Sequence, residues 1–214
     1  MVATTRPSKN RPPKGRARLV RFDRTERWLH WASAAVFLVL IVTAAVLYLA
    51  PISALIGRRN LVRNIHVVVG LMLPVPYLVA RLGPWAAGLR ADSRRLARFD
   101  AEDSRWLRTF GRDRRVRPAK FHPLQKLNAA FTAGSIPVML GTGAIMYWFR
   151  PFPLAWRTGA TFVHDWVSLG LFVTVTIHIA KALADREALA GMWHGRVTRR
   201  WAREHHPRWL EDLK

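Results

Sequence analysis

The chain alternates long apolar stretches with short, strongly polar ones. No Asp, Glu, Lys or Arg occurs in residues 28–57, 64–80 or 127–149, and residues 158–180 contain a single charge, Asp165. A helix needs about 20 apolar residues to cross the hydrocarbon core of a bilayer, whereas a soluble helix or strand would show apolar residues recurring at a regular period. The pattern predicts four transmembrane helices, at about residues 28–50, 62–82, 124–149 and 158–181.

The predicted fold is all-α: an integral membrane four-helix bundle with a long cytoplasmic loop between the second and third helices. We expect residues 21–214 to form this one domain, and residues 1–20, which are basic and have little to bury, to be disordered. Within the loop, residues 93–110 mix Arg and Asp with Leu, Phe and Trp, which predicts a helix on the membrane surface. The first apolar run is too long for a signal peptide, so we expect it to be retained.

The distribution of basic residues predicts the orientation in the membrane. The chain has 35 Lys and Arg residues against 13 Asp and Glu, a net charge of +22. With four spans, the N-terminus, the second loop and the tail share one side, and that side carries 30 of the 35. Positive charge marks the cytoplasmic side. We therefore expect a multi-pass protein of the bacterial cytoplasmic (inner) membrane with both termini in the cytoplasm. The basic stretches flank apolar spans, so we expect lipid and no nucleic acid as their partner.

Four of the eight histidines lie in or at the edges of the predicted spans, where ionisable residues are costly and usually functional. His30 opens the first helix and His178 lies near the inner end of the fourth. His66 opens the second helix on the outer side, and His164 lies near the outer start of the fourth. His164 and His178 are 14 residues apart, which on a helix is about 21 Å of rise and about 40° short of four turns, so they share one face. Each membrane face receives one such pair, as two bis-histidine haems stacked across a bundle would require.

Other interpretations of these histidines stay open at this point. A single His in a membrane helix is often an interhelical hydrogen-bonding residue, and a haem-free anchor or transporter would use the four for packing or as a proton path. Zinc is another ion that imidazole binds. Each pair supplies only two ligands, the chain has no Cys, and few carboxylates are near. That donor set suits a haem, whose equatorial positions are already filled, better than a bare metal ion.

Several motifs resemble those of one family of membrane cytochromes. They read RFDRTERWLHW at 21–31, NIH at 64–66 with Gly70, KFHPLQK at 120–126, and GMWHGRV at 191–197 followed by WAREHHPRW at 201–209. Together they cover nearly all of residues 21–209, and the tail and the 14-residue His spacing are the most specific. The chain resembles the membrane cytochrome b (gamma) subunit of respiratory formate dehydrogenases, within the group of four-helix di-haem b-type cytochromes.

The resemblance implies two haem b groups, with the inner iron held by His30 and His178 and the outer iron by His66 and His164. It implies an iron–sulfur subunit and a molybdenum or tungsten catalytic subunit on the outer side. Electrons would pass through the two haems to the quinone pool, menaquinone or ubiquinone, near the cytoplasmic face. The chain would be a quinone-reducing cytochrome subunit that does not itself carry the primary dehydrogenase site. A thiosulfate reductase, a hydrogenase or another molybdenum enzyme is an alternative partner for the same cytochrome.

The resemblance also implies a quinone site just before the third helix. The family segment has Asn and Gly where this chain has His122 and Leu124, while Gln125 and Lys126 match. Gln125 is thus one candidate quinone contact. His122 is another, because an imidazole near the inner interface can hydrogen-bond a quinone carbonyl and relay a proton near neutral pH. The alternative for His122 is a solvated side chain ahead of a proline at a helix start.

Overall fold

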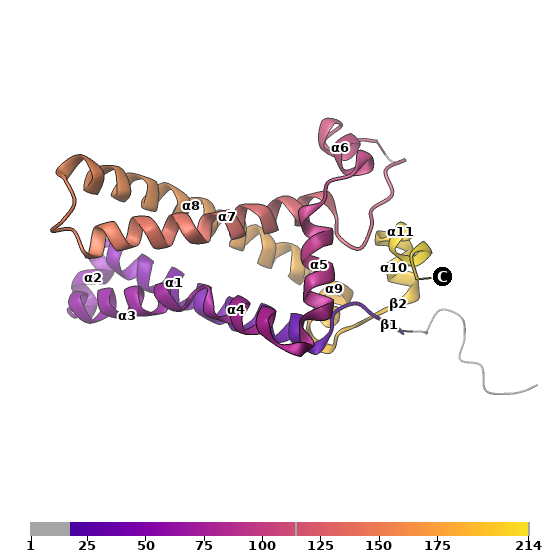
Figure 1. Ribbon diagram of the computed structural model, residues 1–214, viewed down its shortest axis with the longest axis horizontal. Coiled ribbons are helices and arrows are strands. Elements are labelled where there is room, and N and C mark those ends of the chain that lie inside the picture. The colour runs from indigo at the N-terminus through magenta and orange to yellow at the C-terminus, as the bar shows by residue number, and fades with distance from the viewer. Residues whose placement is uncertain (1–17, 114, 214) are drawn as a thin grey trace, which may run out of the picture.

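The computed structural model describes residues 18–113 and 115–213. Figure 1 shows an elongated bundle built from two helical hairpins that lie side by side. The helices long and apolar enough to cross a membrane are α1 (Arg24–Tyr48), α3 (Arg59–Met72) continued by α4 (Val75–Leu82), α7 (Pro123–Tyr147) and α8 (Leu154–Ala184). The prediction of an all-α membrane bundle with four spans is confirmed. The other prediction for this region, that residues 21–214 form one domain, stays a prediction.

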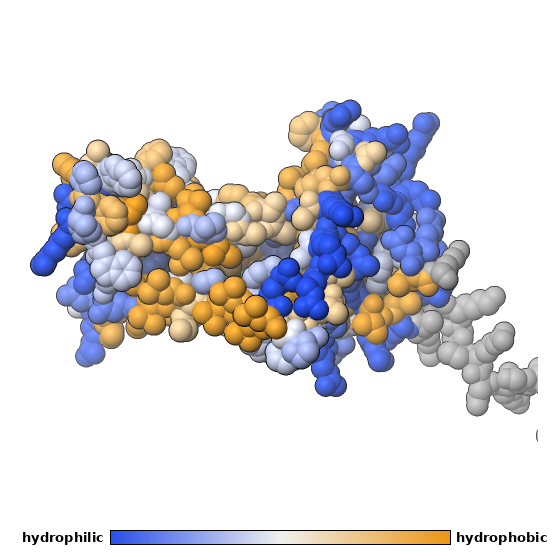
Figure 2. All heavy atoms as spheres, viewed as in Figure 1, coloured by the Kyte–Doolittle hydropathy of each residue, from blue (hydrophilic) through white to orange (hydrophobic). Residues whose placement is uncertain are grey.

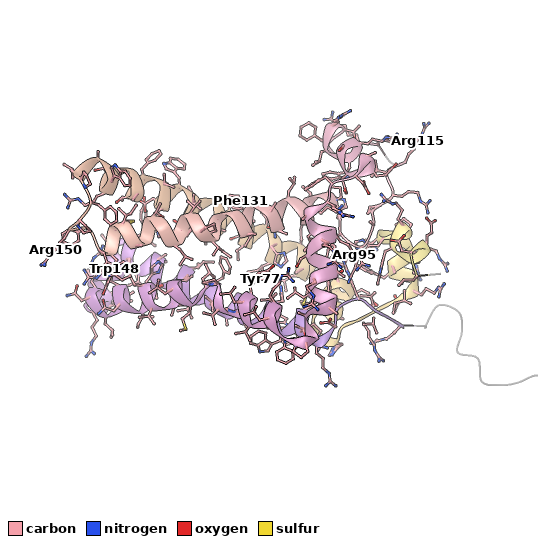
Figure 3. All side chains as sticks on the ribbon, in the orientation of Figure 1. Tyr77, Arg95, Arg115, Phe131, Trp148 and Arg150 are labelled. Atoms are coloured by element: carbon pink, nitrogen blue, oxygen red, sulfur yellow. The ribbon has the colours of Figure 1, made fainter. Side chains whose placement is uncertain are left out.

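Each hairpin is held by direct helix packing. α1 packs along α3 and α4, and the short α2 (Ala50–Ile56) joins them at one end of the bundle. α7 packs along α8, and Gly170 of α8 allows this close approach, because a Cβ there would lie 3.1 Å from the Phe131 ring of α7. Trp148 and Arg150 lie at the same end as α2, whereas Arg95 and Arg115 lie at the opposite end (Figure 3).

The second span is not one continuous helix. α3 ends at Met72 and α4 begins at Val75, with Leu73 and Pro74 between them. A proline inside a helix lacks an N–H group and clashes with the carbonyl of the residue four positions earlier, which here is Gly70. The Leu73 N–H instead donates to the Gly70 carbonyl oxygen at 3.1 Å, a tighter turn than the α-helix. The span therefore keeps its length of 24 residues with a break in its middle.

The sides of the spanning helices are apolar and largely uncovered by protein. Figure 2 shows orange side chains along the bundle and blue side chains gathered over the end that carries α5 and α6. Between 6% and 17% of each span's most apolar window is buried within the chain. Apolar side chains that the protein leaves uncovered fit a lipid environment, where the backbone of a helix satisfies its own polar groups.

One end of the bundle carries most of the remaining structure (Figure 1). Its elements are η1 (Pro84–Ala86), α5 (Ala87–Ala97), α6 (Ala101–Arg108), α9 (Arg186–His194), α10 (Arg199–His205), α11 (Pro207–Glu211) and the strands β1 (Arg18–Val20) and β2 (Arg196–Thr198). β1 pairs antiparallel with β2, so the start and the end of the described chain meet at this end. We call it the inner end, after the cytoplasmic side that the distribution of basic residues predicts.

Two predictions for the polar segments need correction. The single surface helix predicted at 93–110 is two helices, because Asp100 interrupts it and caps α6 by accepting a hydrogen bond from the Asp103 N–H at 2.9 Å. The disordered segment predicted at 1–20 lies mostly outside the described residues, but Arg18–Val20 form β1. A three-residue strand gives no readable periodicity, and its partner β2 lies almost at the other end of the sequence.

The inner end has its own core and a set of buried polar contacts. The core consists of Val197, Trp201, Ala202, Trp209 and Leu210. Lys120 pairs with Asp92 of α5, and Lys126 of α7 pairs with Asp103 of α6, all with side chains at most 11% exposed. These ion pairs fasten α5 and α6 to the start of α7. Removing one partner of such a pair leaves an uncompensated buried charge, so both partners are needed together.

Candidate functional site

The inner histidine pair lies between the two hairpins. His30 comes from the second turn of α1 and His178 from the last third of α8, and their ring centroids are 6.0 Å apart. The Trp31 ring meets the His30 ring edge to face, with centroids 5.1 Å apart. It also lies against the ring of Trp193 of α9, with centroids 4.1 Å apart. The sequence placed these two histidines at the same depth, and the structure brings their rings together.

The outer pair has the same relation at the opposite end. His66 of α3 and His164 of α8 have ring centroids 6.4 Å apart. A threonine of the neighbouring helix hydrogen-bonds each ring. Thr43 Oγ1 of α1 lies 2.8 Å from His66 Nδ1, and Thr142 Oγ1 of α7 lies 2.9 Å from His164 Nδ1. Gly143 of α7 lies directly beside the His164 ring, since a Cβ at that position would lie 3.4 Å from His164 Cε1.

The spacing within each pair fits a metal ion between two imidazoles. Imidazole nitrogen binds a metal at about 2.0–2.1 Å, and each nitrogen lies roughly 1.1 Å from its ring centroid, so two opposed ligands place their centroids about 6.3 Å apart. The observed separations are 6.0 and 6.4 Å. The described residues contain no group of three or more His, Asp or Glu side chains able to hold a metal ion by themselves. Each pair therefore suits a metal whose other positions are already filled.

Buried donors without a partner lie close in sequence to both pairs. Among the described residues, the side-chain donors that are buried and lack a hydrogen bond are Arg21 Nε, Arg27 Nε, Trp31 Nε1 and Arg157 Nε. Arg27 and Trp31 stand one turn or less from His30 on α1. Arg157 stands seven residues before His164 on α8, which is two turns and nearly the same face. Buried donors normally find an acceptor, and the carboxylates of a haem are acceptors of suitable charge.

The two candidate quinone contacts lie together at the start of α7. His122 is the residue that caps the helix, and its backbone N–H donates to Gln125 Oε1 at 2.8 Å while its Nδ1 accepts from the Leu124 N–H at 3.3 Å. The His122 ring meets Trp106 edge to face at 4.6 Å. Burial, and then the charge of Lys181, lower the pKa of His122, so the ring is neutral at neutral pH. The capping bonds give both residues a structural role.

The histidines beyond the last span serve different contacts. His194 is exposed at the end of α9, and His205 stacks on Trp201 with ring centroids 5.0 Å apart. His206 is buried: its Nδ1–H donates to the Ala119 carbonyl oxygen at 2.7 Å, and its Nε2 accepts from Arg21 Nη2 at 3.1 Å. His206 thus joins the tail to both the N-terminal segment and the loop before α7.

Comparison with known proteins decides the family. A family model described as prokaryotic cytochrome b561 matches residues 21–195, a range that includes both histidine pairs. The chain belongs to the prokaryotic cytochrome b561 family. It is a multi-pass membrane cytochrome b, a protein that carries haem b and transfers electrons. The expectation of a b-type cytochrome from the motif resemblance is confirmed.

Individual relatives within this cytochrome group carry more specific names. The chain is 24% identical over 212 residues to the formate dehydrogenase cytochrome b556(fdo) subunit of Escherichia coli, covering 94% of this chain and 96% of the relative. It is 31% identical over 98 residues to the nitrate-inducible formate dehydrogenase cytochrome b556(Fdn) subunit of the same species, covering 44% and 45%. It is also 24% identical over 207 residues to the formate dehydrogenase cytochrome b556 subunit of Haemophilus influenzae, covering 91% and 83%.

Sequence reasoning missed Thr43 and Thr142. A threonine in an apolar helix is unremarkable alone, because its hydroxyl ordinarily bonds back to its own helix. A signal was nevertheless present: each threonine precedes a candidate histidine by nearly the same interval, 43 to 66 and 142 to 164, across the turn of a hairpin. That interval places the two residues at the same depth on adjacent antiparallel helices.

Proposed function

We propose that the chain binds two haem b groups, the inner one through His30 and His178 and the outer one through His66 and His164. The observation that carries this proposal is the pair of matched ring separations, 6.0 and 6.4 Å, each between helices of opposing hairpins. α8 supplies one ligand to each site, and because it is a single uninterrupted helix, it fixes the two sites about 21 Å apart along its axis.

The chain's own residues would hold and orient these groups. When bound, each haem supplies a one-electron carrier whose potential depends on its axial ligands and surroundings. Arg27 and Trp31 would meet the carboxylates at the inner site, and Arg157 those at the outer site, which would satisfy three of the four buried donors that lack partners among the described residues.

We further propose that the chain is the electron-transfer subunit of a formate dehydrogenase-like complex. Support comes from relatives named as formate dehydrogenase subunits, two of which align along more than nine-tenths of this chain. An iron–sulfur subunit and a molybdenum or tungsten catalytic subunit would lie on the outer side. The 30 basic residues on the side that carries the N-terminus, the second loop and the tail support an orientation in a bacterial inner membrane with both termini in the cytoplasm.

A quinone site near the inner face completes this proposal. Reduction of one quinone to quinol takes two electrons and two protons, so the site needs a group that can exchange protons with the cytoplasm. His122 and Gln125 stand together at the inner end, and neutral His122 has a ring nitrogen, Nε2, that makes no hydrogen bond with a described residue. This nitrogen can bond a quinone oxygen. Lys181, whose charge acts on His122, lies one turn beyond His178 on α8.

Replacement of single ligands tests the pairing. In purified, detergent-solubilised protein, His178→Ala and His30→Ala should each remove the inner haem and leave the outer one reducible by an added low-potential donor. His66→Ala and His164→Ala should do the reverse. His194→Ala, an exposed histidine at the end of α9, serves as the matched control and should retain both haems. Retention of two haems at full occupancy in His178→Ala would overturn the assignment.

A further inference from the structure

Two threonines fix the protonation of the outer histidines. The Thr43 hydroxyl lies 2.7 Å from the Val39 carbonyl oxygen, and the Thr142 hydroxyl lies 2.7 Å from the Val138 carbonyl oxygen. A hydroxyl has one hydrogen to donate. Since that hydrogen goes to the helix backbone, each threonine oxygen must accept from the histidine, so Nδ1 of His66 and of His164 carries the proton.

This arrangement leaves Nε2 of both rings unprotonated. Nε2 is then the nitrogen available to a metal, and the Nδ1–H bond sets the rotation of the ring about its own axis. The same arrangement occurs twice: a threonine of one helix acts on a histidine of the next, α1 on α3 and α7 on α8. Thr43 is itself buried, so its contact with His66 is shielded from solvent.

The inner pair has no such partner. Within residues 18–113 and 115–213, no side chain or backbone group hydrogen-bonds a ring nitrogen of His30 or His178. The two sites therefore differ in chemistry although their ring separations are alike. An acceptor on Nδ1–H makes imidazole a more basic ligand, and a more basic axial ligand favours the ferric over the ferrous state.

We propose that Thr43 and Thr142 are positioning residues that orient the two outer haem ligands and lower the midpoint potential of the outer haem, an effect that the inner haem does not receive. The proposal rests on the haem ligation proposed above. The two threonines contact the ligands of the outer haem and not its iron. Their hydroxyl groups should therefore make the midpoint potential of the outer haem differ from that of the inner haem.

The test is a redox titration of the purified holoprotein. The two haems are distinguished by their absorption bands and, in the ferric form, by low-temperature electron paramagnetic resonance. Thr43→Val and Thr142→Val keep the shape of the side chain and remove the acceptor, so each should raise the outer midpoint potential and leave the inner one unchanged. Thr43→Ser and Thr142→Ser retain the hydroxyl and should restore the original potential. Thr158→Val is the matched control, because Thr158 bonds back to Leu154 on α8 at 3.0 Å and has no histidine partner.

The outcomes separate this proposal from the ligation on which it depends. Absence of haem from the unmodified protein would refute the ligation itself. Two bound haems whose potentials and resonance signals are the same in both valine variants would overturn the role of the threonines, as would a shift confined to the inner haem. Loss of the outer haem in the valine variants supports the role if the serine variants keep it, and overturns it if the serine variants lose it as well.

Discussion

Acidification should release the C-terminal tail from the inner end, with His206 as the group that responds. His206 is buried between the Ala119 carbonyl and the Arg21 guanidinium. Burial first, and then the positive charge of Arg21, lower the pKa of His206 from 6.5 to about 3. The docked imidazole is therefore neutral throughout the physiological range, and a proton on Nε2 would break its contact with Arg21.

The size and sign of the effect follow from proton linkage. Below pH 6.5 the released tail binds a proton on His206, whereas the docked tail does not until about pH 3. Docking therefore loses stability as the pH falls from 6.5 towards 3. At about 1.4 kcal/mol per pKa unit, the loss is about 2 kcal/mol at pH 5 and cannot exceed about 5 kcal/mol. Above pH 6.5 the contribution is constant.

Amide hydrogen exchange in α10 and α11 measures this release directly. After correction for the intrinsic exchange rate, protection there should fall about 30-fold between pH 7.5 and pH 5, because about 2 kcal/mol corresponds to that factor. In His206→Gln the tail should dock less tightly, and its protection should no longer depend on pH, since an amide does not titrate. His194→Gln, at an exposed position, should behave as the unmodified chain. An unchanged pH dependence in His206→Gln would refute the reasoning.

Three further changes probe other parts of the structure. Lys126→Met should lower stability by about 3–5 kcal/mol, because it leaves the buried Asp103 carboxylate without its partner. Lys126→Met/Asp103→Leu should recover much of this loss, and equal thermal unfolding of the two variants in detergent would contradict the expectation. Arg157→Gln should weaken haem binding at the outer site alone in a haem titration, and unaltered affinity there would remove Arg157 from that site. Because the chain has no Cys, Ser53→Cys in α2 should be labelled by a membrane-impermeant maleimide in intact spheroplasts and Ser93→Cys in α5 only after lysis. The reverse pattern would invert the proposed topology.

Sequence reasoning predicted the spans well because the bilayer imposes a simple rule on composition. The long apolar runs coincide with α1, α7 and α8, and the second span differs only in its break at Pro74. The start of the first helix was predicted four residues late, because Asp23 caps α1 and the helix therefore begins at Arg24, within the polar segment. The start of α7, which His122 caps, was predicted to within one residue. The 14-residue spacing put His164 and His178 on one face of one helix, and the depths of His30 and His66 matched one of them to each; the structure brings these rings within 6.0 and 6.4 Å of each other.

The inner end was far less predictable. Its ion pairs join residues such as Lys120 and Asp92, and its core joins β1 to the tail, across distances in sequence that periodicity does not report. His206 is a clear example: in the sequence it is one of two adjacent tail histidines, and only its contacts with Arg21 and Ala119 distinguish it from its neighbour. Thr43 and Thr142 were missed for the same reason, because each acquires its role only from contact with a histidine ring on the neighbouring helix.

The two histidine pairs together imply that one chain holds two b-type haems between its hairpins. The most direct measurement is a haem count, by the absorbance of the pyridine derivative against protein quantified by amino-acid analysis, on chain produced with ample haem supply and purified in detergent. We expect two haems b per chain, with a reduced-minus-oxidised spectrum that resolves into two redox transitions. One haem per chain would contradict one of the two histidine pairs, and none would contradict both.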